Sequence, residues 1–182
     1  MGEFSLSFFD TPIWVTYPEL VACSAAGEAL PLPVQALLLY YFGTCDGTPP
    51  AGNWVSFGDL PDGRIYAQAF QGYSGDKLAR QFGSQIAAFQ AACLAAGGQP
   101  VNGGDAAFSF LALPTVPLCV TYWLGEDEFP SNCKVLFDPA VRSHLPTDVC
   151  AILGSMLVSR ISKAGVKVQD QNSQSIKPVA HG

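Results

Sequence analysis

The chain has 182 residues, of which 49% are hydrophobic and 13% charged, and its net charge is −6. This length fits one domain with a core large enough to fold without disulfides or a metal. The first 63 residues contain seven acidic residues and no Lys, Arg or His, and no basic stripe follows Arg64. Because nucleic acids and anionic membrane surfaces attract clustered Lys and Arg, this pattern argues against both as partners.

The N-terminal part of the chain predicts a β-hairpin followed by an apolar helix. Phe4–Phe8 alternates apolar and polar residues, and Ile13–Tyr17 is β-branched and aromatic, so both segments are expected to be strands. Leu32–Phe42 carries a proline in its first turn and is apolar nearly all round, so we expect a buried helix. The longest uninterrupted apolar stretch, Ala36–Phe42, is far shorter than a membrane span.

The centre of the chain combines short aromatic segments with helices. Trp54–Phe57 is short and aromatic, and Ile65–Phe70 is compatible with either a strand or a short helix. Helices are predicted from Gly75 to Phe82 and from Gln85 to about Ala96, each closed by glycine.

The C-terminal part predicts a second hairpin, a last strand and a last helix, at Ala107–Leu113, Pro117–Leu124, Cys133–Phe137 and Asp148 to about Lys163. Strands and helices occur in groups, without strict βαβ alternation. This order favours an α+β fold in which helices pack against a mainly antiparallel sheet. We expect one domain over residues 1–165, and a disordered polar tail over residues 166–182, which lack periodicity.

Six cysteines occur, but no two are spaced as C-x-x-C, so the local signature of zinc ribbons and thioredoxin-type sites is missing. The N-terminus also lacks the positive segment of a secretory signal. We therefore expect reduced thiols and a cytoplasmic protein.

An ordered set of short segments gives the sequence a family resemblance. The set includes Leu32–Gln35, Trp54–Gly63, Tyr122–Pro130 and His144–Asp148. With these segments, the chain resembles the domain-of-unknown-function family 3786 (DUF3786) of anaerobic bacteria and archaea, from about Phe4 to Ile161. Members usually begin with a further helix, whereas this sequence starts almost at the first strand. Some relatives resemble fusions to iron–sulfur modules, which this chain does not carry. The resemblance implies a fold and no catalytic residue.

An aromatic group in the centre of the chain is the first candidate site. Tyr and Trp combine an apolar body with a polar tip, and such groups often line pockets for planar ligands, although they also fill cores. The candidate ligand-binding residues are Trp54, Phe57, Arg64, Tyr66, Phe70 and Tyr73.

Two weaker candidates involve chemistry. Glu126, Asp127 and Glu128 could bind a hard cation or a basic partner, but they also fit a solvated hairpin loop. Cys133 with His144 could form a nucleophilic pair, oriented by Asp138, although the spacing matches no family signature. Packing of Cys133 at the start of a strand is the simpler interpretation.

Three functions remain open at this point. The favoured one is a non-catalytic accessory module that binds a small cofactor-like ligand or a protein. One alternative is a metal- or cysteine-dependent enzyme, and the other is a structural subunit of an oligomer. The sequence defines neither the cofactor nor the partner nor the oligomeric state.

Overall fold

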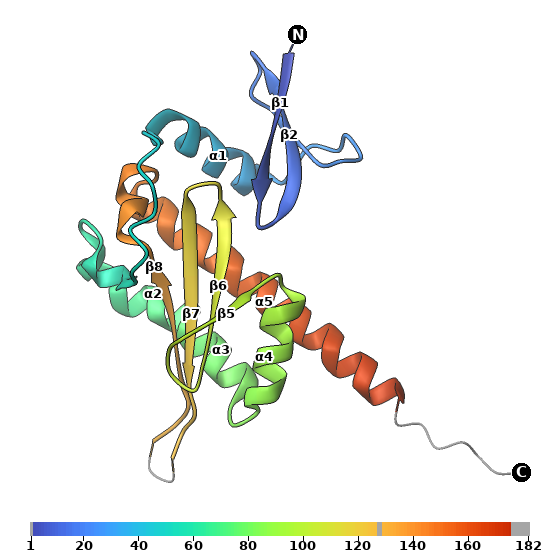
Figure 1. Ribbon diagram of the computed structural model, residues 1–182, viewed down its shortest axis with the longest axis vertical. Coiled ribbons are helices and arrows are strands. Elements are labelled where there is room, and N and C mark those ends of the chain that lie inside the picture. Colours follow the sequence, from blue (N-terminus) through green and yellow to red (C-terminus); the bar gives the residue numbers. More distant parts are fainter. Residues whose placement is uncertain (1, 127–128, 176–182) are drawn as a thin grey trace, which may run out of the picture.

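The structure is a computed structural model and describes residues 2–126 and 129–175. It contains two antiparallel sheets with helices packed against them (Figure 1), which confirms the predicted α+β class.

The smaller sheet is built by the N-terminal segment and has the strand order β1-β2-β3. Its strands are β1 (Gly2–Phe8), β2 (Thr11–Tyr17) and β3 (Ala22–Cys23). The predicted hairpin is confirmed. Its two loop residues, Phe9 and Asp10, both have positive φ (47° and 58°), which matches the twist of a tight hairpin. The Phe9 amide donates to the Ala112 carbonyl (3.0 Å) and thereby attaches this sheet to the larger one.

The larger sheet has the order β4-β8-β7-β6-β5, and each neighbouring pair is antiparallel. Its strands are β4 (Val55–Ser56), β5 (Gln99–Val101), β6 (Ala106–Leu113), β7 (Val116–Trp123) and β8 (Asn132–Phe137). The predicted hairpin of β6 and β7 forms its centre. The helices α3, α4 and α5 cover one face of this sheet (Figure 1).

These three helices are α3 (Gly75–Phe82), α4 (Ile86–Ala95) and α5 (Thr147–Ser175). The bounds of α3 and α4 and the start of α5 are close to the predicted positions. From α4, Phe89 contacts Phe108 of β6 and Tyr122 of β7, with ring centroids 6.1 and 4.5 Å apart. From α5, one stripe is fully buried: Val149, Leu153, Leu157 and Ile161. By length and composition alone, Thr147–Asp170 could cross a membrane, but core helices pass the same test, and 44% of its most apolar window is buried in the fold.

The last helix is longer than predicted. It continues to Ser175, so residues 166–175, which we expected to belong to a disordered tail, are helical. Residues 176–182 of that predicted tail lie outside the described residues. Gly165 lies inside this helix and allows the Phe82 ring to pack closely, since a Cβ there would come within 2.8 Å of that ring.

The first helix, α1 (Leu32–Thr44), contradicts the expectation that it is buried. Only Leu37, Leu38 and Tyr41 are buried, whereas Leu32 is 79% exposed. The reason is its position at the edge of the domain, where one side packs and the other has no neighbouring element among the described residues (Figure 1). The packed side reaches β1 through Phe42 and Phe4 (ring centroids 5.4 Å apart).

The segment that joins α1 to the helical layer is mostly turns. Short 3₁₀ helices occupy Phe57–Asp59 and Gly63–Ile65, and α2 follows at Ala67–Tyr73. The sequence left open whether residues 65–70 form a strand or a helix, and the structure gives a helix. A third 3₁₀ helix, at Pro139–Ser143, leads from β8 into α5.

Candidate functional site

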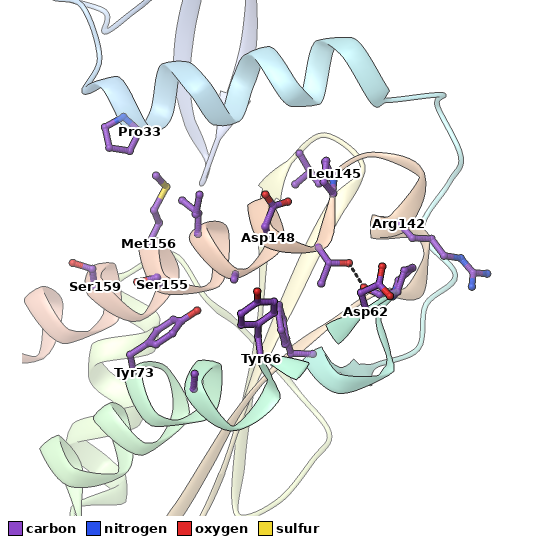
Figure 2. Close-up of a pocket in the computed structure, with 17 residues that line it drawn as sticks. Pro33, Asp62, Tyr66, Tyr73, Arg142, Leu145, Asp148, Ser155, Met156 and Ser159 are labelled. Carbon is purple, nitrogen blue, oxygen red and sulfur yellow. Dashed lines mark hydrogen bonds between the residues drawn. The ribbon is translucent and has the colours of Figure 1, made fainter. Parts of the chain in front are cut away.

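A large groove lies between α2 and the N-terminal half of α5, below the start of α1 (Figure 2). Its volume is about 1060 Å³, and its lining is mainly apolar. Drug-sized ligands occupy pockets of about 300–1,000 Å³, so the groove is large enough to enclose a whole small molecule.

One wall of the groove is aromatic. Tyr66 immediately precedes α2 and Tyr73 ends it, so a spacing of seven residues places both on one side of the helix. The two side chains are 64% and 44% exposed, and both rings extend into the space between α2 and α5 (Figure 2). Partial burial raises the pKa of the Tyr73 hydroxyl, which therefore stays protonated and able to donate a hydrogen bond.

The opposite wall is one stripe of α5. Ile152, Ser155, Met156 and Ser159 follow the spacing i, i+3, i+4, i+7, which places them along one side of the helix. Met156 points toward Pro33 of α1, so α1 closes the groove from above (Figure 2).

The floor is held by stacked aromatic rings. Phe57 lines the groove and is only 3% exposed. Its ring stacks on Phe70 with centroids 4.4 Å apart, and Phe70 packs on Phe137 of β8 at 5.8 Å. Gly154 of α5 admits the Phe70 ring, because a Cβ at that position would lie 2.8 Å from it.

The charged residues of the lining lie toward one end of the groove (Figure 2). Asp62, Arg142 and Asp148 lie there, and Figure 2 shows that the Arg142 side chain extends away from the cavity. The Thr147 hydroxyl donates to the Pro61 carbonyl (2.7 Å) and ties the start of α5 to the turn before α2. A ligand with an apolar body and a polar end would match this distribution.

The six predicted ligand-binding residues separate into three groups. Phe57, Tyr66 and Tyr73 line the groove, and Phe70 supports its floor from below at 2% exposure. Trp54 and Arg64 do not line it; Arg64 instead borders a separate shallow hollow with Asp59. Whether a ligand binds these residues stays a prediction.

The α5 wall was not among the predicted site residues. Its signal was in the sequence, because Ile152 and Met156 repeat at helical spacing beside small polar residues. That spacing alone does not tell which stripe of a helix faces the sheet and which faces a groove.

The structure describes only part of the acidic turn. Glu126 is described and pairs with Phe129 in an isolated β-bridge, while Asp127 and Glu128 lie outside the described residues. Over residues 2–126 and 129–175, no group of three His, Cys, Asp or Glu side chains is placed to hold a metal ion.

The structure does not bring Cys133, Asp138 and His144 together. Cys133 and Phe137 lie near opposite ends of β8, about 13 Å apart at the usual rise of a strand, and Asp138 follows Phe137. The Asp138 carboxylate accepts hydrogen bonds from the amides of Ala51 (2.9 Å), Gly52 (2.8 Å) and Ala140 (2.9 Å). Asp138 is therefore not placed to act together with Cys133.

The contacts of His144 are also structural. Its ring is fully buried, and Nε2 donates to the Thr48 carbonyl at 2.9 Å, since a carbonyl can only accept. Its Nδ1 has no hydrogen-bond partner and lies 4.0 Å from the Asp46 carboxylate. Hydrogen bonds to Thr48 lower the pKa of that carboxyl, which keeps Asp46 charged at neutral pH.

The buried cysteines are poor nucleophiles. Burial raises the pKa of Cys133 well above the usual range and raises that of Cys150 to about 12. It raises the pKa of Cys93 and Cys119 as well. Because the thiolate is the reactive form, these four side chains behave as small apolar core residues at neutral pH.

Comparison with known proteins identifies the family. The family model described as Domain of unknown function (DUF3786) matches residues 1–160, and this range agrees with the resemblance found in the sequence. No curated protein and no solved structure matches the chain. Since the match covers most of its 182 residues, the chain belongs to the DUF3786 family.

Proposed function

We propose that this chain is a non-catalytic binding module whose groove between α2 and α5 holds a small molecule with a planar apolar body. The observation that carries this proposal is the groove itself, with a volume of about 1060 Å³. Tyr66 and Tyr73 on one wall face Ile152 and Met156 on the other. Large, mainly apolar pockets with a few polar groups at one end are typical of ligand sites.

The exposed state of these walls supports the proposal. Tyr66, Tyr73 and Ile152 are 64%, 44% and 46% exposed although they line a concave surface. A planar ring system between the two walls would cover this apolar area and offset the cost of its contact with water. Aromatic side chains add favourable stacked or edge-to-face contacts with such a ligand.

The environment of the reactive residue types supports a role without catalysis. Within the part of the chain that the structure describes, the Asp138 carboxylate accepts hydrogen bonds from three backbone amides, and His144 Nε2 donates to a backbone carbonyl. Burial keeps the Cys133 thiol protonated. A nucleophilic mechanism would need such groups within mutual hydrogen-bond reach.

The first test is native mass spectrometry of protein purified without oxygen, with an ultraviolet–visible spectrum of the same sample. A bound mass or a chromophore is the expected result. A ligand lost during purification is addressed by titration with the fluorescent dye anilinonaphthalene sulfonate, which has a planar apolar body and one polar end. We expect saturable binding with enhanced emission.

Two variants assign the dye to the groove. Ser155→Trp places a large ring in the groove from the α5 wall and should abolish binding. Gln68→Trp adds the same ring at an exposed position of α2 outside the groove lining and should leave binding unchanged. Protein that is bare in the mass spectrum and binds no dye, or binds it equally after Ser155→Trp, would show that the groove is not a ligand site.

A further inference from the structure

The outer side of α1 forms a continuous apolar stripe. Leu32, Ala36, Leu39, Tyr40 and Gly43 are all exposed, with Leu39 and Tyr40 each at 50%. Their spacing places them on one side of the helix, opposite the buried Leu37, Leu38 and Tyr41. The stripe covers eleven residue steps, or about 17 Å. An exposed stripe of this kind marks an interaction surface.

The shape of the stripe fits another helix. A hollow of about 400 Å³ is lined by Ala36, Leu39, Tyr40, Gly43 and Thr44. The first four stand at i, i+3, i+4 and i+7, which is the set of four residues that forms a hole for one knob side chain of a facing helix. The small residues Ala36 and Gly43 form two corners, and the large residues Leu39 and Tyr40 form the other two. A Cβ at Gly43 would meet nothing within 4 Å, so the hollow is open.

The charges around the stripe define its partner. No charged residue occurs between Glu28, four residues before α1, and Asp46, two residues after it. All seven acidic residues of the first 63 are exposed, and this segment contains no basic residue. Among the residues that the structure describes, no Lys or Arg nitrogen lies within 4.0 Å of an acidic side chain. The stripe is therefore apolar, is flanked in sequence by Glu28 and Asp46, and belongs to a segment whose charged residues before Arg64 are all acidic.

We infer that the stripe on α1 docks an amphipathic helix of another protein, with apolar residues on its contact side and Lys or Arg on its flanks. Complementary charge steers and orients such a partner. A second copy of this chain fits less well, because it would bring the same acidic segment against its own kind. The apolar residues of the partner would fill the hollow as helices do in helix-in-groove recognition.

The test uses two synthetic helical peptides of about five turns, roughly 18 residues. Both carry the same leucine stripe, and the remaining positions are Lys in one and Glu in the other. Fluorescence anisotropy should show that the Lys peptide binds at least about tenfold more tightly, and that added salt weakens it. Hydrogen exchange should show protection of residues 32–44. Equal affinity for both peptides, or no binding of either, would overturn the inference.

Matched variants locate the contact. Leu39→Glu should remove binding of the Lys peptide, and Gly43→Leu, which fills the hollow, should weaken it. Leu94→Glu on α4 replaces an apolar residue outside the stripe that is 55% exposed. This variant should bind the Lys peptide as tightly as the original chain. Circular dichroism checks that each variant folds. An equal loss in Leu94→Glu would contradict the assignment to α1.

Two further measurements distinguish this docking mode from peptide binding in the groove between α2 and α5 and from binding of a second copy of this chain. Tyr73→Ala, in the groove between α2 and α5, should bind the Lys peptide unchanged; a loss would place the peptide in the groove instead. Sedimentation should give a monomer. A dimer that Leu39→Glu dissociates would assign the stripe to a second copy and refute the basic partner.

Discussion

Replacement of Asp138 tests how the loop between α1 and β4 is held. The carboxylate is fully buried, and its Oδ1 accepts from Ala51 and Ala140 while Oδ2 accepts from Gly52. In Asp138→Asn, the side-chain oxygen can keep the first two bonds, but its NH₂ group then faces the Gly52 amide, which is also a donor. One charge-assisted bond is lost, and two donors meet.

The expected cost follows from these contacts. A hydrogen bond to a charged group contributes about 1.5–3 kcal/mol, so Asp138→Asn should lower the free energy of unfolding by about 2 kcal/mol. Asp138→Ala loses all three bonds and should cost about 3–5 kcal/mol, less than the sum because the loop amides can reach water. With a urea m-value of about 2 kcal/mol/M, the midpoints should fall by about 1 and about 2 M.

Urea unfolding followed by tryptophan fluorescence measures both values. Glu19→Gln, at an exposed acidic residue, is the control and should stay within about 0.5 kcal/mol of the original chain. An Asn variant as stable as the original chain would refute the claim that the carboxylate holds the loop. An Asn variant as unstable as the Ala variant would refute the assignment of two bonds to Oδ1.

Three other outcomes are expected. A thiol reagent at neutral pH should modify the partly exposed Cys23 and Cys45 quickly, and Cys93, Cys119, Cys133 and Cys150 only on unfolding; rapid reaction of all six would contradict their burial. Burial raises the pKa of Cys150 from 9.0 to about 12, so the thiol of the unfolded chain loses its proton at a lower pH than the thiol of the folded chain. The free energy of unfolding, measured by urea titration, should therefore fall as the pH rises above about 9. A rise in the free energy of unfolding over this range would contradict the direction of the pKa shift. Gly43→Ala, which meets no atom, should stabilise α1 by up to about 1 kcal/mol in thermal unfolding, whereas Gly154→Ala, which meets the Phe70 ring at 2.8 Å, should destabilise; equal effects would contradict the packing.

Much of the candidate site was visible in the sequence, but its two walls were not equally visible. Phe57, Tyr66 and Tyr73 stand out because they are aromatic and close in sequence, and all three line the groove. Phe70 belongs to the same group but lies beneath the floor. Proximity in sequence could not separate the two roles, since the packing of Phe70 on Phe137 depends on a strand far along the chain.

Elements with strong local patterns could be predicted from the sequence. Alternation of apolar and polar residues predicted β1, and glycine closed the predicted helices near the observed ends of α3 and α4. These features depend on neighbouring residues and backbone geometry, so no distant contact is needed to predict them. The family resemblance had the same local origin and is confirmed over residues 1–160.

Tertiary structure alone decided which apolar surfaces are covered. The composition of α1 predicted burial, but the helix lies at the edge of the domain and exposes Leu32, Leu39 and Tyr40. The lack of periodicity after residue 165 predicted a disordered tail, but α5 continues to Ser175. The hydrophobic effect favours the transfer of an apolar side chain out of water. The packing of elements distant in sequence decides whether the same chain provides a surface to cover that side chain.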